Sequence, residues 1–282
     1  MINQGTEDFF LAHQLNIWRR YSYHDFPQRL TGIGEDDVFL FHGGGNFGDL
    51  YPEHVNLLLH ILKEYPRNQI VVLPQTVFFR DKRQKEMICS PMRKHAKLSI
   101  FVRDLHSLDE LQKSGLNDIT AMPDMAHHLV GKLIPNPAIG ADDPLYFIRR
   151  DEEGGNIPST LAFDSRDAVD WVDCISPKDR IAFILLFRAV RGLRAVGSSI
   201  TLYHLWYKLR DSKVRSGVEL LSRSTTIYTN RLHAVLLGLL LGRNVVAFDN
   251  SYGKLSEYYQ TWLSEVPNLK FLKTDTSSYL AS

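Results

Sequence analysis

The stretch TTIYTNRLHAVLLGLLLGRNVVAFDN, residues 225–250, predicts a strand, a helix and a second strand in close succession. Residues 225–230 and 244–250 are short runs rich in β-branched and aromatic side chains, whereas 231–241 is an apolar run typical of a buried helix. Two strands joined by a helix pair in parallel, because the connection crosses over one face of the sheet. This stretch therefore predicts a parallel α/β fold.

The same alternation continues outward along most of the chain. Further strands are expected at 38–42, 70–76, 99–104, 118–122, 145–151 and 269–272, and helices at 9–20, 51–65, 84–94, 107–114, 177–208 and 255–263. The strands are continuous apolar runs, as strands covered by helices on both faces should be. We expect two doubly wound α/β lobes, 1–135 and 136–282, with a proline-rich linker at 134–144. Ligands of such sheets bind at the carboxyl ends of the strands, so we expect the site in the cleft between the lobes.

Net charge, cysteine content and the length of the apolar runs exclude several classes of protein. The chain has 282 residues and a formal net charge of +1, so its bulk charge does not favour nucleic-acid binding. Cys89 and Cys174 match neither a disulfide framework nor a zinc motif, which favours a reducing cytoplasm. The N-terminus is too polar for a signal peptide, and the apolar runs are too short to span a bilayer. We expect a cytoplasmic protein that can work at the inner face of the membrane.

Cationic side chains stand at the start of the helix expected at 231–241. Thr229 or Asn230 is expected to cap this helix, and Arg231 and His233 then fall in its first turn. Because a helix N-terminus already carries partial positive charge, cations there suggest that an anion binds beside them. Arg231 can hold a carboxylate or phosphate through two hydrogen bonds, and His233 can donate a proton. The alternative interpretation is a solvated arginine and a capping histidine.

The run HGGGNFGD, residues 42–49, follows a strand. Its glycines allow the backbone to approach a ligand closely, and Asn46 and Asp49 can bind hydroxyl groups or act as a base. We expect Gly44 and Gly45 to face the ligand together with the first N–H groups of the next helix. The spacing matches neither a dinucleotide fingerprint nor a P-loop. The alternative is a tight turn whose glycines only relieve steric conflict.

Three further segments carry polar groups at expected strand ends. DNSYGK (249–254) offers Asn250, Ser251 and Lys254, and FIRRD (147–151) offers Arg149. Each segment could equally be a plain turn or a solvated strand end. PDMAHHL (123–129) is a loose cluster that we interpret as structural or as lining an acceptor site, without a metal. The arginines at 188, 191 and 194 recur like a solvated helix face.

In this order, these segments resemble the polysaccharide pyruvyl transferase family, over about residues 5–263. The matching strings are FHGGGNFGDLYPEH (41–54), VVLPQT (71–76), RD (103–104), PDMAHHL (123–129), FIRRDEE (147–153), NRLHAVLLGLLLG (230–242) and DNSYGKLSEYYQTW (249–262). The resemblance implies a GT-B-like fold of two Rossmann-like lobes. It also implies transfer of the enolpyruvyl group of phosphoenolpyruvate onto a sugar of an exopolysaccharide or its lipid-linked precursor, as a pyruvate ketal, with release of phosphate. No cofactor or metal is implied, and peripheral membrane association and a homo-oligomer are left open.

The residues fit such a donor, since phosphoenolpyruvate carries a carboxylate and a phosphate that need fixed cations. Arg149, Arg231 and Lys254 are the expected cations, with His233 as the general acid and Asp49 as the base. The remaining expected contacts are Asn250, Ser251, Gly44, Gly45 and Asn46.

One departure concerns the first lobe. Related sequences begin with a strand and an N-x-G-D loop before the helix that corresponds to residues 5–15, so we expect that strand to be missing here. Two alternatives stay open. One is a glycosyltransferase that uses a nucleotide sugar, with Asp249 holding the ribose, and the other is a non-catalytic relative that only binds anions.

Overall fold

The computed structural model describes residues 1–27, 29–133, 143–150, 157–158, 161, 164–195, 202–249 and 253–272. The chain divides into two compact units. The N-terminal unit contains Ile2–His128 and Leu185–Leu205, and the C-terminal unit contains Met1, Leu129–Ile184 and Trp206–Ser282. Residues 134–142 lie outside the described part, and with them most of the expected linker and the boundary at 135/136.

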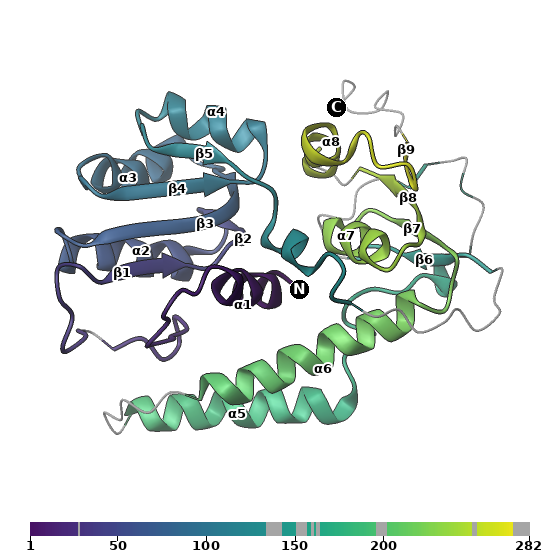
Figure 1. Ribbon diagram of the computed structural model, residues 1–282, viewed down its shortest axis with the longest axis horizontal. Coiled ribbons are helices and arrows are strands. Elements are labelled where there is room, and N and C mark those ends of the chain that lie inside the picture. The colour runs from purple at the N-terminus through teal and green to yellow at the C-terminus, as the bar shows by residue number, and fades with distance from the viewer. Residues whose placement is uncertain are drawn as a thin grey trace. The chain divides into compact units, whose positions relative to one another are not determined.

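The N-terminal unit is built on a parallel sheet (Figure 1). Its strands are paired in the order β1-β3-β4-β5, with β2 also beside β3. Apolar side chains of the sheet and its helices, such as Ile61, Val72 and Val102, form one core cluster. The strands are β1 (Val38–Phe41), β2 (Gly44–Gly48), β3 (Gln69–Phe78), β4 (Leu98–Val102) and β5 (Ile119–Ala121), and the helices are α1 (Ile2–Ala12), α2 (Pro52–Glu64), α3 (Lys82–Arg93), α4 (Leu105–Lys113) and the 3₁₀ turn η1 (Met125–Leu129).

The glycine run is not a tight turn between a strand and a helix, because residues 44–48 form the strand β2. This strand continues β1 along the same side of β3, after a break at His42 and Gly43. The break faces Pro74, which has no N–H to donate to a ladder. At this point the side-chain amide of Gln75 donates to the carbonyl oxygen of His42 at 2.6 Å. A Cβ on Gly43 would meet the carbonyl oxygen of Pro74 at 2.6 Å, so the close approach needs glycine.

The C-terminal unit has a second parallel sheet, with the order β6-β7-β8-β9. Phe147, Ile227 and Leu237 lie in its core. The strands are β6 (Leu145–Phe147), β7 (Thr226–Thr229), β8 (Asn244–Phe248) and β9 (Leu269–Leu272). The helices are α7 (Leu232–Leu240), α8 (Lys254–Tyr258), the π-helical turn η3 (Tyr259–Leu263) and the 3₁₀ turn η2 (Ser165–Asp167). Both sheets confirm the predicted parallel α/β class.

Two expected helices have different bounds in the structure. The helix expected at 9–20 is α1, which ends at Ala12, where Gln14 adopts a left-handed conformation (φ 53°) and the Leu15 N–H returns to the carbonyl oxygen of Phe10. The single helix expected at 177–208 is two helices, α5 (Pro177–Ala195) and α6 (Tyr203–Leu221). Apolar spacing does not show where one helix ends and another begins. Among the described residues, no helix is long and apolar enough to cross a bilayer.

Candidate functional site

Charged residues of the C-terminal unit lie where its strands end. Arg149 follows β6, Arg231 follows β7 and Asp249 follows β8. Parallel pairing places Phe147 beside Thr229 and Thr229 beside Ala247, so these strands end at one edge of the sheet. That edge is where open parallel sheets bind ligands.

Arg231 forms a forked ion pair with Asp170. Its Nε donates to Oδ1 at 2.8 Å and its Nη2 donates to Oδ2 at 2.5 Å, and both side chains are largely shielded from water. The sequence analysis inferred that an anion belongs beside the start of α7, and in this structure the chain supplies one from a distant loop. Two parallel hydrogen bonds fix the plane of the guanidinium as well as its position.

Asp170 also organises the loops around this pair. Its carboxylate accepts the backbone N–H of Arg150 at 3.2 Å and that of Trp171 at 2.7 Å. Asp173 accepts the N–H of Asp170 at 2.8 Å and a guanidinium hydrogen of Arg150 at 2.5 Å. Neither Asp170 nor Asp173 is among the residues predicted from the sequence. The available signal was an acid inside the apolar run AVDWV (168–172), where a buried carboxylate needs a partner.

Asn230 joins the ends of β6 and β7 and does not cap α7. Its side-chain oxygen accepts the Arg149 N–H at 2.7 Å, and the residue is buried. The hydroxyl of Thr229 accepts the N–H of Arg231, which is itself the N-cap residue of α7. The expected cap by Thr229 or Asn230 is therefore wrong by one or two positions, because the Thr229 hydroxyl accepts the N–H of the N-cap residue itself and the Asn230 side chain binds the loop that follows β6.

The other predicted residues of this unit are described to different extents. His233 is half-buried in the first turn of α7, as expected. Asp249 accepts backbone N–H groups at the start of α8, from Leu255 at 3.3 Å and Ser256 at 3.5 Å. Asn250 and Ser251 lie outside the described residues, and the structure does not describe the side chain of Lys254.

The N-terminal unit has its own buried polar cluster at the carboxyl edge of its sheet. Arg103, directly after β4, donates from Nε to the hydroxyl of Thr76 at 2.6 Å and from Nη1 to Asp124 Oδ2 at 2.7 Å. All three side chains are buried. A Cβ on Gly45 would lie 3.2 Å from Arg103 Nη2, so the glycine run passes directly over this guanidinium. Arg103 and Thr76 belong to the strings that resemble the family, but neither was predicted to have a role in the site.

His42 stands at the break between β1 and β2, beside this cluster. The residue as a whole is exposed, but the protein atoms around the imidazole desolvate it and lower its pKa, against the opposing effects of a backbone hydrogen bond at Gly43 and the charge of Asp124. His42 is therefore a largely neutral imidazole at physiological pH.

Asp49 lies at the end of β2 and is bound to the loop that follows β3. Its Oδ2 accepts the N–H of Arg80 at 2.7 Å and of Asp81 at 2.9 Å. Among the residues that the structure describes, no donor reaches its buried Oδ1. At about 3.3 Å per residue, Asp49 is roughly 13 Å along the strand from Gly45. The expectation that Gly44 and Gly45 adjoin the N-terminus of α2 is wrong, because β2 separates them, and the side chain of Asn46 is not described.

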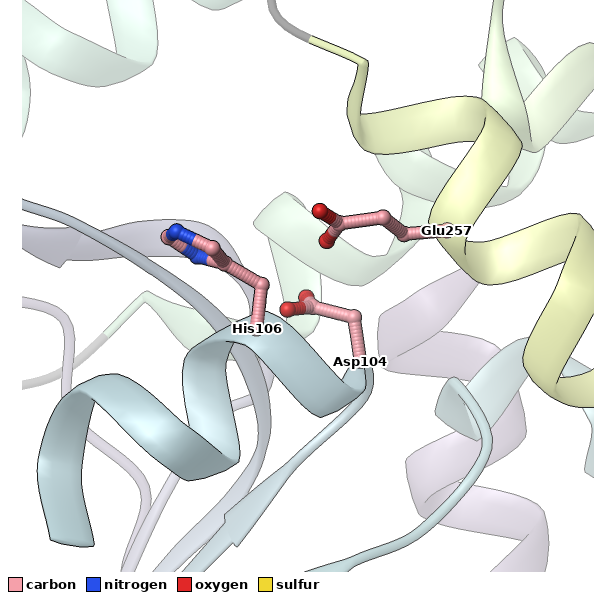
Figure 2. Close-up of side chains that lie close together, drawn as sticks. All are labelled: Asp104, His106 and Glu257. Atoms are coloured by element: carbon pink, nitrogen blue, oxygen red, sulfur yellow. The ribbon is translucent and has the colours of Figure 1, made fainter.

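Asp124 and His128 have further partners within this unit. Asp124 accepts the Ala126 N–H at 2.9 Å, and His128 packs edge-on against Phe9. Figure 2 shows Asp104 and His106 at the start of α4. Asp104 is the N-cap residue and accepts the Ser107 N–H at 2.7 Å, and His106 is exposed. Glu257, also drawn there, belongs to α8 of the C-terminal unit.

Both cysteines are buried thiols. Desolvation raises the pKa of Cys174 to about 11, with the charges of Asp173 and Asp170 adding to it, and desolvation also raises the pKa of Cys89. A thiol that stays protonated at neutral pH is a poor nucleophile and metal ligand. The two cysteines are structural.

The chain is similar to known proteins in sequence and in fold. Residues 6–252 match the family described as polysaccharide pyruvyl transferase. The chain belongs to this family. "Putative pyruvyl transferase EpsO" of Bacillus subtilis (strain 168) is 32% identical over 279 residues, which are 96% of this chain and 83% of that protein. "Pyruvyl transferase 1" of Schizosaccharomyces pombe (strain 972 / ATCC 24843) is 25% identical over 266 residues, and the match spans 86% of this chain but only 59% of that protein.

A solved structure shares the fold of this family member. An uncharacterized protein from Klebsiella pneumoniae subsp. pneumoniae NTUH-K2044 superposes with a TM-score of 0.59, over 96% of this chain and 86% of that one. The sequences are 20% identical, so the likeness concerns the fold alone. Family membership places the chain among transferases of polysaccharide biosynthesis.

Proposed function

We propose that this protein transfers the enolpyruvyl group of phosphoenolpyruvate onto two hydroxyls of a sugar, as a pyruvate ketal, with release of phosphate. The sugar belongs to an exopolysaccharide or to its lipid-linked precursor. The observation that carries the proposal is the set of arginines at the ends of β6 and β7, where Asp170 holds Arg231 in a fixed plane. Membership of the polysaccharide pyruvyl transferase family supports pyruvyl transfer as the type of reaction.

The C-terminal unit is the proposed donor site. Phosphoenolpyruvate presents two anionic groups, and a guanidinium of fixed plane matches a carboxylate or phosphate in geometry as well as charge. Arg149 and Arg231 follow neighbouring strands whose ends are tied together by Asn230. Lys254, at the start of α8, is the third proposed cation, and Asn250 and Ser251 of the preceding loop are proposed to orient the donor.

The chemistry needs one acid and one base. Protonation of C3 of the enol makes C2 electrophilic, and a sugar hydroxyl adds to C2 as it loses its proton. The C2–O bond to phosphate then breaks, and a second hydroxyl of the sugar closes the ketal ring with loss of its own proton. We assign the acid to His233, which lies in the first turn of α7 beside Arg231. Neither a metal nor a cofactor is part of the proposal.

The N-terminal unit is proposed to hold the acceptor. Arg103 and its partner Asp124 place hydrogen-bonding groups at the carboxyl edge of this sheet, and such groups can bind the hydroxyls of a sugar. Gly44, Gly45 and Asn46 run past this pair, and Asp49 is proposed as the base or as the residue that orients a hydroxyl. Its buried Oδ1, which no donor reaches within the described chain, supports that role over a purely structural one.

The reaction is tested by incubating the protein with phosphoenolpyruvate and candidate glycans, and by following phosphate release together with the mass gain of the sugar. We expect His233→Ala and Arg231→Ala each to lower turnover by at least about 100-fold, the scale of general acid catalysis and of fixed electrostatic contacts. Turnover that stays at the wild-type level in either variant contradicts the site. Thermal shift by nucleotide sugars, without a shift by phosphoenolpyruvate, would favour the glycosyltransferase alternative.

The variant Asp49→Asn distinguishes a catalytic role of the Asp49 carboxylate from a role in anchoring the loop that follows β3. The amide oxygen can still accept the N–H groups of Arg80 and Asp81, so we expect a melting temperature within a few degrees of wild type. Loss of the carboxylate should lower kcat by roughly 100-fold or more. An unchanged kcat would leave Asp49 as an anchor of the loop that follows β3.

A further inference from the structure

Helix α5 exposes an apolar face that the proposed reaction does not use. Ile181, Ile184 and Leu185 are separated by three and four residues, so they lie on one side of the helix. Their exposed fractions are 59%, 45% and 59%, whereas Leu186 and Val190, on the other side, are buried. Large aliphatic side chains gathered on an exposed helix face usually mark a binding surface.

The same face carries three of the five cationic residues of the helix. Lys178, Arg188 and Arg191 continue the spacing of three and four residues, and all three are exposed. Asp179 is the only acid in α5, and its carboxylate accepts hydrogen bonds from Ser176 at 3.0 Å and Ser212 at 2.9 Å. The exposed face therefore combines apolar side chains with cations and has no carboxylate.

This charge pattern favours an anionic lipid surface over a second copy of the chain as the partner that covers this face. A second copy packed on this face would bring its own arginines against Arg188 and Arg191, and like charges in a desolvated interface are costly. A surface of anionic lipid headgroups would instead neutralise them while the aliphatic side chains enter the headgroup boundary. Because α5 is too short in apolar sequence to cross a bilayer, such a helix lies in the plane of the interface.

We propose that α5 is a membrane-docking helix, with Ile181, Ile184 and Leu185 entering an anionic lipid surface and Lys178, Arg188 and Arg191 binding its headgroups. Through this face the protein works at the membrane. Lipid binding needs no substrate, so the proposal stands or falls independently of pyruvyl transfer.

The charge requirement is tested with the full chain and two kinds of vesicle, phosphatidylcholine alone and phosphatidylcholine mixed with phosphatidylglycerol. Cosedimentation should show binding to the mixed vesicles only, and the binding should weaken as salt is added. Arg188→Glu/Arg191→Glu should bind at least about 30-fold more weakly. Lys94→Glu/Lys97→Glu, on an exposed part of the N-terminal unit, changes the net charge equally and should bind like wild type. An equal loss of binding to the mixed vesicles in both variants would overturn the proposal.

A second matched pair of variants tests whether the apolar side chains are required for vesicle binding. Ile181→Ser/Leu185→Ser should lose most of the binding without a change in charge. Met87→Ser/Leu105→Ser removes two side chains of nearly equal exposure, 57% and 55%, from α3 and α4 and should retain it. Two results would overturn the proposal: wild-type protein that does not bind the mixed vesicles, or light scattering that shows a dimer dissociated by Ile181→Ser/Leu185→Ser. The second would assign the face to another copy of the chain.

Discussion

Asp170 explains how an arginine is tolerated at the start of α7. Arg231 stands where the helix already carries partial positive charge, and the carboxylate of Asp170 compensates both. The pair is largely buried, so removal of one partner leaves an uncompensated charge in a poorly solvated place. Asp170 is thus a positioning residue for Arg231.

We expect Asp170→Asn to destabilise the protein by about 3–5 kcal/mol, because Arg231 loses a buried partner. The KM for phosphoenolpyruvate should rise more than kcat falls, since the arginine remains but its plane is no longer fixed. Urea unfolding and steady-state kinetics measure the two effects. Asp164→Asn, which breaks the exposed pair with Arg166, is the control and should change neither. An unaltered KM would show that the pair is structural only.

Among the elements, β2 depends most on glycine. Gly48 has φ of 130°, and a Cβ there would meet the carbonyl oxygen of Phe78 at 1.8 Å. Both the conformation and the contact exclude a side chain. Since β2 carries Asp49 at its end, the fit of Gly48 against β3 also sets the position of that carboxylate.

Gly48→Ala should therefore lower the free energy of unfolding by roughly 3 kcal/mol, from backbone strain and the clash with Phe78. Chemical denaturation measures this effect. Gly192→Ala, in α5, is the matched control. Its Cβ meets nothing within 4 Å, and alanine is the better helix former, so stability should rise by up to about 1 kcal/mol. A fall of similar size in both variants would contradict this explanation.

Across the whole molecule, the N-terminal unit concentrates desolvated histidines. Burial lowers the pKa of His24, His42, His54 and His127, in each case against the charge of a nearby acid. The unfolded chain binds protons as the pH falls through about 6.5, whereas the folded chain stays neutral to lower pH. The contribution of these histidines to the free energy of unfolding is therefore fully present above about pH 6.5. It is lost as the pH falls from about 6.5 toward the lower pKa values of the folded state.

Thermal melts between pH 8 and pH 5 should accordingly show a falling melting temperature below about pH 6.5. His54→Gln removes one of the shifted groups and should make this decline shallower. The exposed His106→Gln, at the start of α4 (Figure 2), should leave it unchanged. A pH dependence that is the same in His54→Gln as in wild type would show that His54 does not contribute.

The sequence by itself determined the family, the parallel sheets and most of the strands and helices, though not β2 or the division between α5 and α6, because apolar spacing and short motifs are local properties. It also indicated Arg231 and His233, since their conflict with a helix N-terminus can be read from adjacent residues. Only the tertiary structure decided the partners of the charges. Asp170 is 61 residues from Arg231 in the sequence, and Asp124 is 21 residues from Arg103. The strand β2 likewise follows from how the glycines fit against β3. A charge is neutralised by whatever the folded chain brings within a few ångströms of it, and sequence spacing does not encode that distance.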